Sequence, residues 1–284
     1  MEILIGKTAG FCFGVKNAVT KTEEKLKENE NIYCLGELVH NRQVTQELLD
    51  KGIKFIENIE EGKNKVIIRS HGVQKSVYDK AKELNIELID LTCPKVLHIH
   101  KIVQEYSDKG YFIFLIGKTE HPEMKGTVSF CETEYYIIES EEQINNAVKD
   151  FENSNKDKAL VISQTTFSLE KFQKIVDKMK TMINFQTLEI KNTICSATKE
   201  RQEETEFIAK QVDSMIIVGG KHSSNSNKLY ELAKKYCKLV MFVETEEEID
   251  LKKLKNINSI GIMAGASTPQ KSIEKVVEKL KTIC

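Results

Sequence analysis

The sequence lacks the features of a membrane-bound or nucleic-acid-binding protein. Lys and Arg together number 42 and Asp and Glu 43, so the net charge of −1 gives no electrostatic case for such partners. The longest apolar runs, such as Tyr111–Ile116 and Met215–Val218, are far shorter than the roughly 20 residues of a membrane span. The N-terminus has neither the charged n-region nor the long apolar h-region of a signal peptide. We therefore expect a soluble cytoplasmic protein that binds neither nucleic acid nor membrane.

The seven cysteines include no CxxC pair, the spacing at which zinc sites usually place their ligands. An odd number of scattered cysteines, in a chain without an export signal, also argues against a disulfide framework. Tryptophan is absent, prolines number three, and no segment rich in Pro, Gly or Ser marks a linker. The 284 residues suffice for a sizeable core and for about two domains, with one or three also compatible.

The sequence does contain a regular alternation of short apolar strands with charged amphipathic helices. The strand candidates are Ile3–Ile5, Ile32–Leu35, Val66–Arg69, Leu88–Leu91, Phe112–Ile116, Tyr135–Ile138, Ala159–Ser163, Gln186–Ile190, Ser214–Val218, Val240–Val243 and Ser259–Met263. Helix candidates, with apolar residues three and four apart, include Lys16–Lys27, Ser76–Leu84, Leu169–Met182, Lys199–Val212 and Lys271–Lys281. This alternation predicts an α/β fold with parallel sheets.

An internal repeat becomes visible when the chain is aligned on three cysteines that each precede a predicted helix. These cysteines are Cys12, Cys93 and Cys195. Polar residues follow them at the same spacing of 28 residues, each in a turn after a strand: His40, His121 and Ser223. A second set follows later strands, and we take its members as equivalent: His71, Thr165 and Ser267. The repeat therefore predicts three related units with one order of cysteine and polar turns.

We divide the chain into three small parallel-sheet α/β modules on the basis of this repeat. They comprise residues 14–92, 93–193 and 194–284, and the N-terminal segment 1–13 is expected to join the third module. Ligands of open α/β sheets bind beyond the carboxyl ends of the strands, where all nine repeat residues lie. A pseudo-threefold arrangement of the modules would bring these residues to one centre.

Three cysteines at equivalent positions favour a shared metal centre over three separate core residues, the alternative reading. A helix N-terminus lowers the pKa of a thiol and so favours the thiolate that binds metal. Iron–sulfur clusters are held by thiolates and usually need four. Three ligands leave one iron open, and an open iron can bind a substrate oxygen as a Lewis acid. We interpret the remaining cysteines as structural or incidental: Cys34, Cys131, Cys237 and Cys284.

The polar turns combine histidines with hydroxyl and amide side chains, which is typical of a phosphate or diphosphate site. The residues are His40, His71, His121, Thr165, Ser223, Ser224, Asn225 and Ser267. The alternative is that the hydroxyl and amide residues only cap helices. Glu123 lies two residues after His121 and is a candidate proton donor, although most glutamates are solvated surface groups. The remaining histidines, His98, His100 and His222, have weaker claims.

At these residues the chain resembles the 4-hydroxy-3-methylbut-2-enyl diphosphate reductase family, the last enzymes of the methylerythritol phosphate route to isoprenoids. The segments that carry the resemblance are GFCFGV, GELVHN, RSHGV, DLTCPKV, HPEMKGT, QTTFS, TICSATKERQ, GGKHSSNSNKL and GASTPQ, in the family's order. They extend over almost the whole chain. Small departures lie at Glu120, Asn192 and the pair Lys221-His222, and none removes a candidate ligand.

The resemblance implies a central 4Fe–4S cluster held by Cys12, Cys93 and Cys195. It implies diphosphate binding by the eight polar residues named above, and catalytic roles for Glu123, His121 and Thr165, with Glu123 delivering the proton. It also implies reductive dehydroxylation at the open iron, giving isopentenyl and dimethylallyl diphosphate, with ferredoxin or flavodoxin as electron donor. Two alternatives are a zinc-dependent hydrolase of a phosphorylated metabolite and a non-enzymatic iron–sulfur redox protein.

Overall fold

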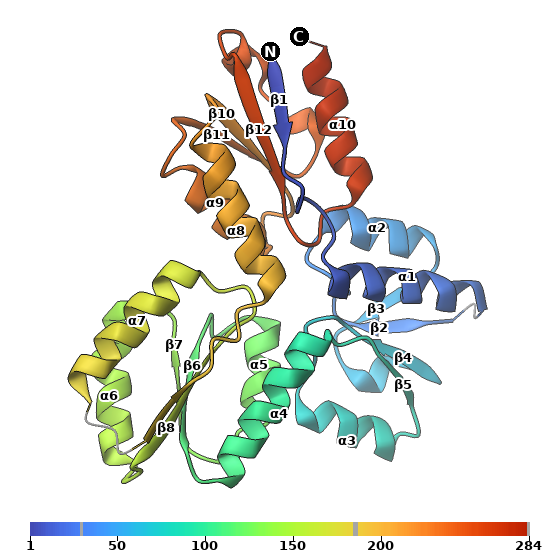
Figure 1. The fold of residues 1–284 in the computed structure, drawn as a ribbon. Helices are drawn as coiled ribbons and strands as arrows, with labels where there is room; N and C mark the ends of the chain where they lie inside the picture. Colours follow the sequence, from blue (N-terminus) through green and yellow to red (C-terminus); the bar gives the residue numbers. More distant parts are fainter. Residues whose placement is uncertain (29–30, 184–186, 283–284) are drawn as a thin grey trace. The chain divides into compact units, whose positions relative to one another are not determined.

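The computed structural model describes residues 1–28, 31–183 and 187–282. Within these residues, the strands form three four-stranded sheets, and every pair of neighbouring strands is parallel (Figure 1). The predicted α/β class with parallel sheets is therefore confirmed. None of the helices in the described part of the chain combines the length and the apolar character that a bilayer crossing requires.

The three sheets share one strand order. The first sheet runs β3 (Lys54–Ile56), β2 (Tyr33–Leu35), β4 (Lys65–Ile68), β5 (Glu87–Asp90). The second runs β7 (Tyr135–Ile138), β6 (Phe112–Ile116), β8 (Lys158–Ser163), β9 (Thr187–Ile190). The third runs β11 (Leu239–Val243), β10 (Ser214–Val218), β12 (Ser259–Ala264), β1 (Glu2–Ile5). The internal repeat seen in the sequence thus corresponds to a repeat of topology.

The first strand of the chain completes the third sheet. β1 pairs in parallel with β12, from Glu2 opposite Ser259 to Ile5 opposite Ile262. The two strands lie side by side, β1 in dark blue and β12 in orange-red (Figure 1). Each of the other two sheets obtains its corresponding edge strand, β5 or β9, from the end of its own segment. The module boundaries themselves stay a prediction.

Helices connect the strands within this pattern. They are α1 (Phe13–Glu28), α2 (Arg42–Asp50), α3 (Lys75–Glu83), α4 (Pro94–Asp108), α5 (Pro122–Val128), α6 (Ile144–Asn153), α7 (Leu169–Met182), α8 (Ser196–Ala209), α9 (Ser224–Ala233) and α10 (Gln270–Lys281). Short 3₁₀ turns lie at Ile59–Glu61, Glu141–Gln143, Glu246–Glu248 and Leu251–Leu254. Apolar helix faces and sheet faces pack together, and the central strands β6 and β10 are buried along their whole length.

The chain forms two compact units. One comprises Met1–Glu24, Glu37–Ile53 and Ser196–Cys284, and contains the third sheet; we call it the terminal unit. The other comprises Lys25–Gly36 and Lys54–Cys195, and contains the first and second sheets; we call it the middle unit.

The predicted elements agree closely with the structure where the apolar run is long. β6, β7, β10 and α7 have the predicted bounds. The edge strand β3 was not predicted, because three residues of which one is lysine give no clear β pattern. Gln186, the predicted start of β9, and Cys284 lie outside the described residues.

Candidate active site

The first polar turn of each sheet begins at a glycine directly after a central strand. The N–H group of each glycine donates to the last carbonyl of the neighbouring edge strand. These bonds are Gly36 to Ile56 at 2.8 Å, Gly117 to Ile138 at 3.0 Å and Gly219 to Val243 at 2.9 Å. His40, His121 and Ser223 each follow four residues later. The predicted equivalence of these three positions therefore agrees with the local structure. His121 and Ser223 are the N-cap residues of α5 and α9.

The three candidate cluster cysteines are held by one recurring hydrogen bond. Their N–H groups donate to a carbonyl two residues beyond the end of the other central strand: Cys12 to Ala266 at 3.0 Å, Cys93 to Ser70 at 3.0 Å and Cys195 to Thr165 at 2.9 Å. Each bond joins a cysteine to a turn of its own unit. The cysteines are thus structurally equivalent, as the repeat predicts.

The second set of polar residues requires a correction of one position. Ser70, Thr165 and Ala266 are equivalent because each receives the N–H of a cysteine. His71 and Ser267 therefore correspond to Thr166, and the predicted equivalence of Thr165 with them is wrong. Counting from the cysteine could not reveal this shift, because the segments before the turns differ in length.

Glu123 is a buried carboxyl group held by Thr165. Its side chain is 2% exposed and lies in the first turn of α5. The Thr165 N–H donates to Oε1 and the Thr165 hydroxyl to Oε2, both at 2.6 Å. Burial raises the pKa of Glu123 to about 7, although these two bonds act to lower it. Glu123 is therefore not one of the solvated surface glutamates, which was the alternative interpretation of its sequence position.

His121 lies beside Glu123 in the same turn. Its Nδ1 accepts the N–H of Glu123 at 3.2 Å, which places the proton of a neutral ring on Nε2. The rings of His71 and His121 meet edge to face, with centroids 5.5 Å apart. The middle unit therefore brings together His71, His121, Glu123 and Thr165, and the Thr165 carbonyl binds the Cys195 N–H.

The terminal unit gathers a second group of the predicted residues. The hydroxyl of Ser267 donates to the carbonyl of His40 at 3.1 Å. Ser223 accepts the N–H of Ser226 at 3.3 Å, so its capping role is real. Ser224 and Asn225 are buried in the first turn of α9.

Asn225 is the least satisfied of these residues. It is 3% exposed, and among residues 1–28, 31–183 and 187–282 neither its Oδ1 nor its Nδ2 has a hydrogen-bond partner. Buried polar groups are normally paired, so an amide in this condition points to a ligand. Helix capping alone does not explain Asn225.

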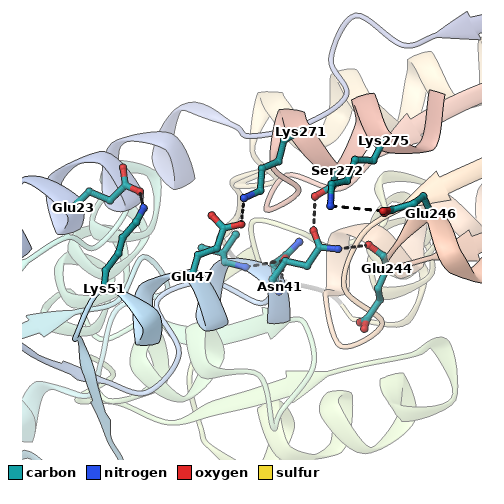
Figure 2. Close-up of polar contacts among 11 residues, drawn as sticks. Glu23, Asn41, Glu47, Lys51, Glu244, Glu246, Lys271, Ser272 and Lys275 are labelled. Atoms are coloured by element: carbon teal, nitrogen blue, oxygen red, sulfur yellow. Dashed lines mark hydrogen bonds and ion pairs between the residues drawn. The ribbon is translucent and has the colours of Figure 1, made fainter. Parts of the chain in front are cut away.

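Contacts made by α2, drawn in Figure 2, hold the segment that carries His40 in place within the terminal unit. Asn41 caps α2 by accepting the N–H groups of Gln43 and Val44 at 3.0 and 3.2 Å. Gln43 donates to the Glu244 carbonyl at 2.9 Å and accepts the Ser272 hydroxyl, while Lys271 pairs with Glu47. These contacts join α2 to α10 and to the segment after β11.

Two charged residues beside His40 were not predicted. Glu37 lies 3.6 Å from the His40 ring, and its contact with His40 lowers the pKa of Glu37. Arg42 lies 3.1 Å from the His222 ring. Glu37 and Arg42 stand within the GELVHNR stretch, so their closeness to His40 in sequence was the available signal. His222, a weaker candidate for the site in the sequence analysis, is thus in contact with Arg42.

The cysteine chemistry fits an iron–sulfur cluster at the three predicted positions. Cys12, Cys93 and Cys195 form no disulfide within the described residues and are partly exposed. Burial raises the pKa of Cys34 and of Cys131 to about 12, so those thiols stay protonated and are poor metal ligands. Cys237 is buried and donates to the Ala209 carbonyl at 3.0 Å.

Together, the fold and these residues define an α/β protein with three equivalent parallel sheets, each with one cysteine held at a polar turn. A family model described as LytB protein matches residues 3–281, and the chain belongs to this family. The predicted resemblance is thus confirmed, and the family implies an iron–sulfur cluster.

Curated relatives named 4-hydroxy-3-methylbut-2-enyl diphosphate reductase cover the chain. The protein of Caldanaerobacter subterraneus subsp. tengcongensis is 42% identical over 100% of this chain and 98% of the relative. That of Clostridioides difficile is 41% identical over 100% of both. A solved structure of the E-1-hydroxy-2-methyl-but-2-enyl-4-diphosphate reductase from Plasmodium falciparum has a TM-score of 0.89 and 31% identity, covering 98% of this chain and 87% of that one. These relatives favour neither the zinc hydrolase nor the electron carrier.

Proposed function

We propose that this chain reduces (E)-4-hydroxy-3-methylbut-2-enyl diphosphate to isopentenyl and dimethylallyl diphosphate. Two electrons and two protons enter, the allylic C–O bond breaks, and the oxygen leaves as water. The observation that carries the proposal is the buried Glu123 carboxyl, held by Thr165 in the turn that also binds the Cys195 N–H. The names of the full-length relatives support the same reaction.

Glu123 is the proposed proton donor. A buried carboxyl group with a pKa of about 7 carries its proton at neutral pH in a large part of the molecules. Thr165 contacts both carboxyl oxygens, and we assign to its hydroxyl the relay of a proton between Glu123 and a substrate oxygen. His121, with its proton on Nε2, offers a hydrogen-bond donor beside them.

We assign diphosphate binding to the predicted polar residues. In the middle unit these are His71, His121 and Thr165, and in the terminal unit they are His40, Ser223, Ser224, Asn225 and Ser267. The buried Asn225 amide supports this assignment, since it lacks a partner within the described residues. Helix N-termini such as that of α9 attract anions through their free N–H groups and the helix dipole.

Cys12, Cys93 and Cys195 are the proposed ligands of one 4Fe–4S cluster. When bound, the cluster supplies the electrons and, at the iron without a cysteine, a Lewis acid. The partners we propose are the diphosphate substrate and a ferredoxin or flavodoxin that delivers single electrons, and the proposed location is the cytoplasm.

An anaerobic assay tests the function. Cluster-loaded protein should oxidise a reduced viologen dye when the hydroxylated diphosphate is added and should release the two isoprenoid diphosphates. No dye oxidation by protein that contains stoichiometric iron and sulfide would reject the proposal. Colourless, zinc-loaded protein after anaerobic purification would instead favour the hydrolase.

A further inference from the structure

The segment that leads to Cys12 is a loop between β1 and α1 that contains a turn, in which the Ala9 N–H donates to the Gly6 carbonyl at 3.2 Å. Its ends are tied to β12 and to the turn after it: the Gly6 N–H donates to the Ile262 carbonyl at 2.9 Å and the Cys12 N–H to the Ala266 carbonyl at 3.0 Å. Residues 7–11 between these ties belong to no helix or strand. The position of the Cys12 thiol therefore depends on what holds this loop.

Glu204 of α8 holds the first half of the loop. Its carboxylate accepts the N–H of Lys7 at 2.7 Å, the N–H of Thr8 at 2.8 Å and the Thr8 hydroxyl at 2.5 Å. Burial acts to raise the pKa of Glu204, but the hydrogen bonds from Thr8 and Lys7 outweigh it and lower the pKa below its ordinary value. The carboxylate is ionised at neutral pH, and charge-assisted bonds of this kind are about twice as strong as neutral ones.

Arg201 of α8, nearly one helical turn earlier, holds the second half. Its side chain is 4% exposed, and it donates from Nη2 to the Gly10 carbonyl at 2.6 Å and from Nη1 to the Ala197 carbonyl at 2.8 Å. Gly10 has a φ of 101°, a conformation that favours glycine. Burying a guanidinium costs free energy unless its N–H groups are hydrogen-bonded. The Arg201 side chain therefore favours keeping its bond to the Gly10 carbonyl, and this bond fixes the loop two residues before Cys12.

We propose that Arg201 and Glu204 are positioning residues that hold segment 6–12 in the conformation that presents the Cys12 sulfur to the cluster. The same helix begins directly after Cys195 in the sequence, so α8 both follows one proposed ligand and fixes the loop of another. This inference rests on the proposed cluster for its purpose, but the clamp itself is a property of the protein without metal.

The chain offers a matched pair of variants for the test. Glu204→Gln removes the charge that binds the loop, whereas Glu203→Gln changes an exposed neighbour on the same helix that lies 3.7 Å from Lys199. Arg201→Met removes the donor to Gly10, and Arg201→Lys keeps the charge. Melting temperatures identify any variant that fails to fold.

The decisive measurement is the alkylation rate of Cys12 in metal-free protein under anaerobic conditions, followed by peptide mass spectrometry. Weakening the charge-assisted bonds of Glu204, or removing the bond from Arg201 to Gly10, should open the loop about tenfold more often and raise this rate accordingly in Glu204→Gln and Arg201→Met. The rate at Cys93 and the behaviour of Glu203→Gln should match the wild type, and Arg201→Lys should lie in between.

Cluster loading gives the second measurement. Glu204→Gln should lose iron in air several-fold faster than Glu203→Gln after identical anaerobic reconstitution. Unchanged Cys12 alkylation in folded Glu204→Gln would overturn the clamp, even should Arg201→Met not fold. Failure of the wild type to bind iron would reject the proposed cluster, and the alkylation result would still decide the clamp.

Discussion

Thr165 donates both its backbone N–H and its hydroxyl to the Glu123 carboxyl, each over 2.6 Å. The two residues are 42 positions apart and come from different turns, one after β8 and one at the start of α5. The two hydrogen bonds fix the Glu123 carboxyl in one orientation, and the residue is buried away from water. A group held in this manner is suited to proton transfer at a defined atom.

Replacing Glu123 tests its role as proton donor. Glu123→Gln keeps the shape and can still bond to Thr165, but it cannot release a proton. We expect turnover with the diphosphate substrate to fall at least about a hundredfold while the iron content stays normal. Glu120→Gln is the control, because Glu120 is exposed and pairs with Lys125. Equal rates in Glu123→Gln and the wild type would identify another donor.

Glu123 also gives the stability of the metal-free protein a pH dependence of known sign. Its pKa is raised from 4.5 to about 7 on folding, so the folded state binds the proton more tightly. Its contribution is fully present below pH 4.5 and decreases by about 3 kcal/mol as pH rises through 7. Urea unfolding should therefore find Glu123→Gln more stable than the wild type at pH 8 and equal to it near pH 4.

His100 should produce the opposite slope. It is 3% exposed and stacks on Phe130 at 4.4 Å, and burial lowers its pKa from 6.5 to about 4. The neutral ring contributes fully above pH 6.5, and about 3 kcal/mol is lost as pH falls to 4. We expect His100→Leu to flatten this acid limb of the stability curve. The exposed His98, changed to Gln, should leave the limb as it is.

The cysteines are tested by iron and sulfide analysis after anaerobic purification. Cys12→Ser, Cys93→Ser and Cys195→Ser should each give protein with a lost or altered cluster spectrum. Cys34→Ser should retain it, since Cys34 is buried and its thiol is protonated. A normal cluster in all three site variants would remove the ligand assignment.

Asn225 and Asn227 allow binding to be separated from stability. Asn225 has no partner among the described residues, whereas Asn227 donates to the carbonyls of Lys221 and Ser223 at 2.6 and 2.9 Å. We expect Asn225→Ala to raise KM for the diphosphate about tenfold with no loss of melting temperature. Asn227→Ala should lower the melting temperature. The reverse pattern would assign Asn225 to structure.

The sequence predicts those features that depend on local pattern. Phe112–Ile116 is a continuous apolar run and forms the strand that it predicts, and the equal spacing after three cysteines correctly aligns His121 with Ser223. β3 is missed because an edge strand of three residues carries little pattern. Thr165 is placed one residue out of register, since counting along the chain ignores differences in loop length. The contacts of Glu204 with Lys7 and Thr8 join residues almost 200 positions apart, which no local pattern encodes.

The pairing of β1 with β12 determines when the third sheet can be completed during synthesis of the polypeptide. Residues 2–5 are translated long before their partners, 259–262. Such non-local parallel pairing is slow to form, and an apolar strand is prone to aggregate until it has paired. Cys12 acquires its backbone anchor on Ala266 only after that residue has been made. Until then the nascent chain carries this thiol without its fixed setting, so we expect the proposed cluster to be inserted only after residue 266 has been made.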